Sequence, residues 1–80
     1  MHEWHITEEL LDKVCVQAKE NGLTRIRKVQ VALGEDSDIT NDSLCFCFQL
    51  LAEKTIARGA ELDIKSSPGA FLDLLSFEGE

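Results

Sequence analysis

Apolar residues near the start of the chain recur with the spacing of one helical face. They are Leu10, Leu11, Val14, Cys15 and Ala18. Thr7 precedes them and can cap a helix through its hydroxyl, and Asn21–Gly22 supplies the left-handed residue at which helices often stop. The pattern predicts a first helix over roughly residues 7–21.

The pattern changes to a period of two from Thr24 to Leu33, where Val29, Val31 and Leu33 alternate with more polar neighbours. This alternation is typical of a half-buried strand. A polar loop over residues 34–41 follows and leads to a second helix, capped by Thr40 or Asn41 and ended by Gly59. The apolar stripe predicted for this helix consists of Leu44, Cys47, Phe48, Leu51 and Ile56.

Two further apolar segments, residues 60–66 and 71–77, read as strands joined by a tight turn at Ser66-Ser67-Pro68-Gly69. We expect these two strands to form an antiparallel hairpin, and the first and second strands to be parallel because a helix connects them. The predicted fold class is α+β, with two helices on one face of a three-stranded mixed sheet in the order α-β-α-β-β. Residues 1–80 then form a single domain.

The third predicted strand carries apolar side chains in both alternating positions, and two helices cover only one face of a sheet. Domains of this size gain little net free energy from folding alone, so further burial would stabilise the protein. We therefore predict a homodimer formed through the open face or an edge of the sheet.

The net charge and the length of the apolar runs argue against nucleic acid and a membrane as partners. The chain of 80 residues has a formal net charge of −7, which disfavours nucleic acid as a partner. The longest apolar run, Leu44 to Phe48, is far too short to span a membrane. The N-terminal residues lack the basic and apolar regions of a secretory signal, so we expect a cytoplasmic protein.

Catalytic and cysteine motifs are absent from the sequence. It contains no Gly-rich phosphate loop, no GxSxG and no HExxH, so we expect no enzymatic activity. Cys15, Cys45 and Cys47 form no CxxC pair. On a helix, Cys45 and Cys47 would point about 200° apart, which prevents them from sharing a metal. Small, reduced, buried thiols are the better interpretation.

The N-terminus offers the one candidate metal site. The α-amine of Met1, the backbone nitrogen of His2 and its imidazole can close two adjoining chelate rings, a nitrogen-rich donor set that suits Ni(II) or Cu(II). Glu3 or His5 could supply a fourth ligand. The competing interpretation is a frayed terminus with solvated histidines.

Three sequence stretches resemble the HypA/HybF family of nickel metallochaperones. They are the start Met1-His2-Glu3, the segment Val31-Ala32-Leu33-Gly34-Glu35, and the run from Leu44 to Glu53, which continues through Ile56 to Ile64. The resemblance implies nickel binding by Met1-His2-Glu3. It also implies a HypB-like GTPase partner and delivery of nickel to the large subunit of [NiFe]-hydrogenase and, in some organisms, to urease.

The sequence departs from this family between the last two strands. Family members carry a zinc-binding module there, built on two CxxC pairs, and this chain has Ser66-Ser67-Pro68-Gly69 instead. We therefore expect no zinc. Two hypotheses follow: a nickel-binding accessory protein, or a zinc-free interaction domain of the same fold in which metal binding is incidental.

Overall fold

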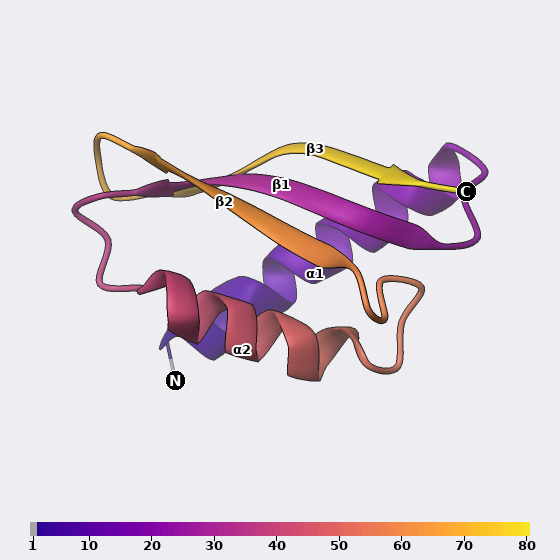
Figure 1. Ribbon diagram of the computed structural model, residues 1–80, viewed down its shortest axis with the longest axis horizontal. Coiled ribbons are helices and arrows are strands. Elements are labelled where there is room, and N and C mark those ends of the chain that lie inside the picture. Colours follow the sequence, from indigo (N-terminus) through magenta and orange to yellow (C-terminus); the bar gives the residue numbers. More distant parts are fainter. Residues whose placement is uncertain (1) are drawn as a thin grey trace.

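Two helices cover one face of a three-stranded sheet (Figure 1). The computed structural model describes the backbone of residues 2–80 and the side chains of residues 3–80. The helices are α1 (His2–Glu20) and α2 (Asn41–Ala52), and the strands are β1 (Ile26–Gly34), β2 (Glu61–Ser67) and β3 (Leu72–Gly79). The predicted fold class and element order are confirmed.

Helix α1 begins earlier than predicted. Thr7 is not its N-cap but an interior residue, fully buried, whose hydroxyl donates to the carbonyl oxygen of Glu3 at 2.5 Å. A threonine hydroxyl is satisfied equally well at a cap or by the carbonyl one turn earlier, so the residue type alone did not fix the boundary. The predicted end is confirmed: Leu23 N donates to the carbonyl oxygen of Ala18 at 2.9 Å, which closes α1 around Gly22.

Helix α2 begins as predicted and ends early. The Thr40 hydroxyl accepts a hydrogen bond from Ser43 N at 3.1 Å and is the N-cap. The helix was predicted to reach Gly59 but stops at Ala52. There, both the backbone nitrogen and the hydroxyl of Thr55 donate to the carbonyl oxygen of Ala52, at 2.9 Å each. These bonds tighten the chain into turns, which still bring Ile56 and Ala57 onto the core.

The strand order is β2-β1-β3, so the predicted hairpin between the last two strands is wrong. β1 is parallel to β2, as predicted, and antiparallel to β3. The most apolar strand thus takes the centre, where Val31 pairs with Ile64 on one side and with Leu74 on the other.

The β2–β3 connection crosses over the end of β1. In this connection, Phe71 O accepts a hydrogen bond from Gly34 N at 2.7 Å and Gly69 O accepts one from Asp36 N at 2.9 Å. Glu35 N donates to the carbonyl oxygen of Ser67, the last residue of β2, at 2.7 Å. A Cβ on Gly34 would overlap the carbonyl of Gly69, so this position has room for glycine only. To pass from one side of β1 to the other, the connection must span two strand spacings, about 10 Å. Its four residues, 68–71, reach about 13 Å when extended, so this short connection is long enough.

The outer face of the sheet is polar, contrary to the expectation of apolar side chains on both faces of the third strand. The register between β3 and β1 shifts by one residue: Gln30 pairs with Ser76, but Val31 pairs with Leu74. Leu75 is therefore an extra residue of β3 with no partner in β1. On the outer face, Gln30 donates to Asp63 (3.0 Å) and accepts from Ser76 (2.7 Å). Association through the open face would have to bury these polar groups, so we expect the predicted dimer to use a sheet edge.

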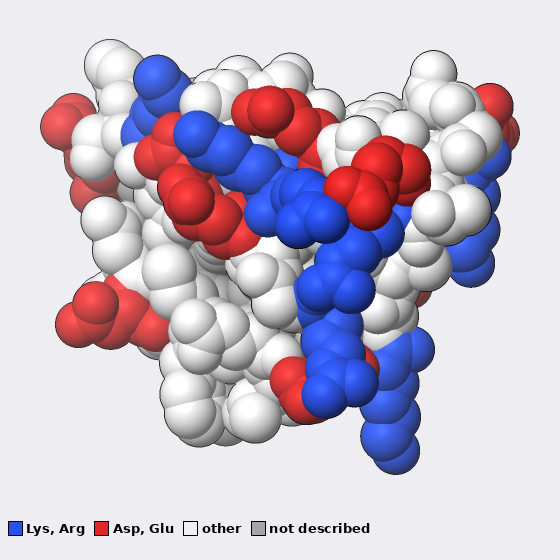
Figure 2. Space-filling model, turned by 45° about the vertical axis from the view of Figure 1, so that its right-hand side comes forward, with Lys and Arg blue, Asp and Glu red and all other residues white. Residues whose placement is uncertain are grey.

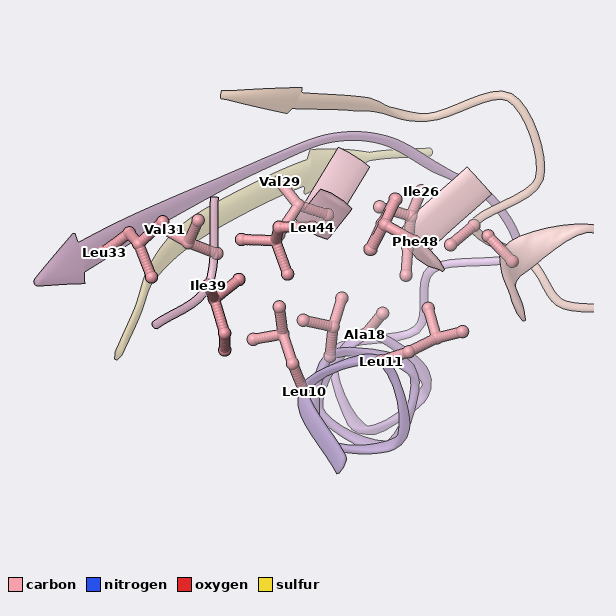
Figure 3. Packing of buried hydrophobic residues seen from close by; sticks show 13 residues of the cluster. Leu10, Leu11, Ala18, Ile26, Val29, Val31, Leu33, Ile39, Leu44 and Phe48 are labelled. Carbon is pink, nitrogen blue, oxygen red and sulfur yellow. The ribbon is translucent and has the colours of Figure 1, made fainter. Parts of the chain in front are cut away.

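The core lies between the helices and the inner face of the sheet (Figure 3). Phe48, Leu44, Ile26, Val29 and Val31 are fully buried within it. Leu72, Leu74 and Phe77 of β3 pack against its margin. Because both helices contribute to this one cluster, the first turns of α1 have a fixed place beside the sheet.

Candidate metal centre

The predicted metal ligands lie in the first two turns of α1. Met1 is outside the described residues, and only the backbone of His2 is described, already in helical conformation. Glu3 is half-buried and His5 is exposed. Because a helix leaves its first four N–H groups without intrahelical acceptors, the backbone nitrogen of His2 is not needed by the helix itself.

Helical spacing places His5 one turn from His2. Residues three apart are neighbours on a helix surface, so both positions belong to the same side of α1. In this structure the His5 Nε2 lies 3.3 Å from Glu9 Oε1, one turn further along. To join a metal at the helix start, the His5 imidazole would have to leave Glu9. Both side chains are well exposed, so this contact costs little to break.

Residues behind the ligands fix the position of this helix start. The buried Thr7 hydroxyl holds the Glu3 carbonyl, as described above. Ile6 lines two small cavities, one of about 180 Å³ beside Leu72 and Leu74 of β3, and one of about 210 Å³ beside Ala70 and residues 36–39. Ile6 also packs against the core cluster, as Leu72 and Leu74 of β3 do, and this packing holds the first turns of α1 beside the sheet. Sequence reasoning assigned Thr7 to a cap and did not find Ile6.

The other metal-ligating side chains do not converge. Among the described residues, no group of three His, Cys, Asp or Glu side chains is arranged to hold a metal ion. Cys47 is buried, Cys15 and Cys45 are half-buried, and all three are free thiols. Burial, and secondarily the Asp42 carboxylate, raises the pKa of Cys45 above its ordinary value, which keeps this thiol protonated near neutral pH.

Comparison with known proteins decides the family. The family described as "Hydrogenase/urease nickel incorporation, metallochaperone, hypA" matches residues 1–72. This chain belongs to the HypA family. It is 38% identical over 71 residues to a hydrogenase maturation factor HypA from Dehalococcoides mccartyi, covering 89% of this chain and 60% of the relative. It is 43% identical over 65 residues to one from Chlorobium limicola, covering 81% and 56%.

Solved HypA structures share the fold. The solution structure of the Ni metallochaperone HypA from Helicobacter pylori matches with a TM-score of 0.86 at 20% identity, covering 96% of each chain. A second HypA solution structure matches with a TM-score of 0.78 at 22% identity, covering 100% of this chain and 97% of the other. The HypA-like chain described here spans about 60% of the length of the first curated relatives it matches. No helix in its described part, residues 2–80, is long and apolar enough to cross a membrane.

Proposed function

We propose that this HypA-family chain binds Ni(II) and serves as an accessory protein in the maturation of [NiFe]-hydrogenase or urease. The observation that carries the proposal is the family match, which begins at residue 1 and therefore includes the candidate ligands. The description of the family names nickel incorporation and a metallochaperone. A metallochaperone binds a metal and releases it, and this role needs no catalysis.

The proposed ligands are the Met1 α-amine, the His2 backbone nitrogen and the His2 imidazole, with Glu3 and His5 beside them. Five- and six-membered chelate rings close around such a donor set, and nitrogen donors in one plane suit Ni(II). The helix start disfavours a bare cation, because its dipole is positive there. A deprotonated His2 nitrogen and the Glu3 carboxylate supply the negative charge that offsets this effect.

The proposed partners are a HypB-like GTPase and the hydrogenase large subunit, in the cytoplasm. We propose that zinc is not required, because residues 66–69 stand where the family's zinc module is expected and the described residues hold no group of three His, Cys, Asp or Glu able to bind it. The short crossing over Gly34 completes the sheet without such a module.

Isothermal titration calorimetry with Ni(II) tests the proposal on untagged protein. His2→Ala should abolish stoichiometric binding, because it removes the imidazole that closes the chelate. An N-terminal Gly-Ser extension should do the same by removing the free amine. His5→Ala is the matched histidine control and should weaken binding less. Equal, weak binding by all four proteins would instead favour the interaction domain in which metal binding is incidental.

A further inference from the structure

The two edges of the sheet differ in regularity. β2 follows β1 in register over all seven of its residues, from Glu61 to Ser67, without a shift. The pairing of β3 with β1 shifts twice and leaves Leu75 as an extra residue. A bulge twists an edge away from further pairing, whereas a regular edge stays open to it. β2 (Figure 1) is therefore the edge to which another strand can be added.

The free edge of β2 presents the backbone groups of alternate residues. Ser67 turns its carbonyl oxygen towards β1, where it accepts the hydrogen bond from Glu35 N at 2.7 Å. Because the backbone groups of successive strand residues point to opposite sides, Leu62, Ile64 and Ser66 direct theirs away from β1. A row of such N–H and C=O groups on an edge strand is a template for pairing with another chain.

The side chains of β2 separate apolar from charged residues. Leu62 and Ile64 are half-buried and pack against the margin of the core. Asp63 and Lys65 alternate with them and lie on the outer face, where Asp63 Oδ2 accepts a hydrogen bond from Gln30 Nε2 at 3.0 Å. Among the described side chains, 3–80, neither Asp63 nor Lys65 takes part in an ion pair. Two opposite charges on one face are thus available to an added strand.

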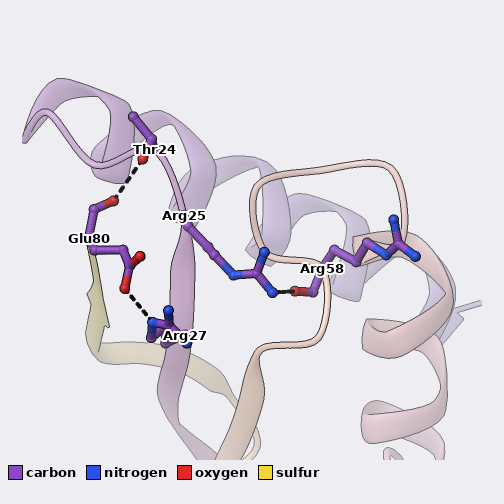
Figure 4. Close-up of polar contacts among 5 residues, drawn as sticks. All are labelled: Thr24, Arg25, Arg27, Arg58 and Glu80. Carbon is purple, nitrogen blue, oxygen red and sulfur yellow. Dashed lines mark hydrogen bonds and ion pairs between the residues drawn. The ribbon is translucent and has the colours of Figure 1, made fainter.

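The charges along β3 suit a second copy of this chain less well. β3 contains Asp73 and Glu78 and no lysine or arginine. Arg27 of the neighbouring β1 is already paired, because its Nε lies 2.6 Å from Glu80 Oε2 at the end of β3 (Figure 4). Pairing of two β3 strands would therefore gather carboxylates without a cation to offset them, which is unfavourable between facing strands.

Basic side chains gather near the start of β1, where Arg25, Arg27 and Lys28 follow closely along the chain. Figure 2 shows basic and acidic side chains lying side by side on one face of the molecule. Lys28 Nζ lies 4.0 Å from Oε2 of Glu61, the first residue of β2. Glu61 thus has a cation of its own chain beside it, and Asp63 is the β2 carboxylate left for a cation of another chain.

We propose that two copies of this chain associate by antiparallel pairing of their β2 strands about Ile64, which joins their two three-stranded sheets into one. In this register all seven residues of β2 overlap, and Ile64 faces Ile64 of the other copy. Leu62 of each copy faces Ser66 of the other, so the outward backbone groups form about six hydrogen bonds. Asp63 of each copy faces Lys65 of the other in the closer, non-hydrogen-bonded type of pair.

The backbone and the charges together select this register. A slip by one residue would set outward backbone groups against groups that point to β1. A slip by two would set Asp63 opposite Asp63, and like charges directly opposite are destabilising. Each copy carries a net charge of −7, but this repulsion is screened beyond about 8 Å at physiological ionic strength. Close pairs at the strand therefore decide whether the copies associate.

Sedimentation equilibrium of metal-free protein tests the dimer independently of the proposed nickel site. We expect twice the monomer mass, with dissociation on dilution. Lys65→Glu turns two attractions per dimer into two repulsions, so it should raise the dissociation constant by about tenfold or more. The double variant Asp63→Lys/Lys65→Glu exchanges the two charges and should restore the dimer. Circular dichroism verifies that each variant is folded.

Controls at the end of α1 separate the facing pair from net charge. Lys19→Glu changes the net charge as Lys65→Glu does and should leave the dissociation constant unchanged. Glu20→Lys/Lys65→Glu restores the net charge without restoring the pair and should dissociate like Lys65→Glu. A wild-type monomer at high concentration, or equal effects of Lys19→Glu and Lys65→Glu, would overturn the proposal. So would a dimer that only Phe46→Ser dissociates, because the interface would then be the exposed side of α2.

Amide hydrogen exchange locates the interface. The amides of Leu62, Ile64 and Ser66 should exchange more slowly as the protein concentration rises, whereas those of Asp63 and Lys65 point to β1 and should not change. Ser66→Pro removes one outward N–H at an exposed edge position, where proline is tolerated, and should abolish the dimer without unfolding the chain. Concentration-dependent protection of β3 amides instead would show that the other edge pairs and that the proposal is wrong.

Discussion

Replacing Gly34 by alanine should destabilise the fold more than the same change at an open position such as Gly22. The new Cβ would overlap the Gly69 carbonyl oxygen and lie 2.6 Å from the Gly69 carbonyl carbon and 2.7 Å from Phe71 N, all backbone atoms. To relieve this contact the β2–β3 connection must move, which breaks the bonds from Gly34 N to Phe71 O and from Asp36 N to Gly69 O.

The expected cost follows from those two bonds. Gly34 is buried, and a buried hydrogen-bonding group left unsatisfied costs about 1–3 kcal/mol, whereas the loss of the bond from the exposed Asp36 amide costs about 0.5–1.5 kcal/mol, so the two losses together give about 1.5–4.5 kcal/mol. A domain of 80 residues has a total stability of about 4–12 kcal/mol, at roughly 0.05–0.15 kcal/mol per residue. Gly34→Ala should therefore remove a large fraction of the free energy of unfolding.

Urea denaturation followed by Trp4 fluorescence measures this loss, and hydrogen exchange of the Gly34 and Asp36 amides locates it. Gly22→Ala is the control: Gly22 has φ +77° and nothing within 4 Å of the added Cβ, so only the left-handed backbone is penalised, by about 1–2 kcal/mol. If Gly34→Ala lowers stability no more than Gly22→Ala, and the two amides stay protected, the crossing over β1 is not packed as described.

The remaining predictions concern metal binding, thiol reactivity and association. Ni(II) affinity should fall steeply below neutral pH in a calorimetric pH series, because protons compete with the metal for α-amines and imidazoles, whose ordinary pKa values are about 7.7–8.0 and about 6.5. A pH-independent affinity would exclude these ligands. Cu(II) should bind more tightly than Ni(II). Elemental analysis of protein purified without added metal should find no stoichiometric zinc, and thiol titration should find buried Cys47 the slowest of three reactive cysteines. Light scattering should give the mass of a homodimer, which we expect to form through a sheet edge, and a monomer mass at high concentration would contradict it.

Local sequence signals determined the elements and the family. Periodicity placed both helices and all three strands, and Asn21–Gly22 and Thr40 marked helix ends where the structure has them. These signals act over a few residues, because capping and alternation depend on near neighbours along the chain. The ligand set at Met1, His2, Glu3 and His5 came from the local order of donor groups together with the family resemblance, and it stays a prediction.

Tertiary structure decided what those signals left ambiguous. Thr7 became an interior residue because the hydroxyl found a carbonyl one turn earlier, and α2 stopped at Ala52 because Thr55 took its carbonyl. In each case the same residue type satisfies its hydrogen bonds in two ways, and packing against the core selects one.

Strand pairing was the largest such choice. A short turn after β2 favours a hairpin locally, yet β3 pairs with β1, because Leu72, Leu74 and Phe77 then face the helices beside the most apolar strand. Two bulges in that pairing leave Arg27 and Leu75 as extra residues, so the exposure of both side chains also follows from the register. Composition determined the net charge of this protein, whereas the fold determined where its cations gather.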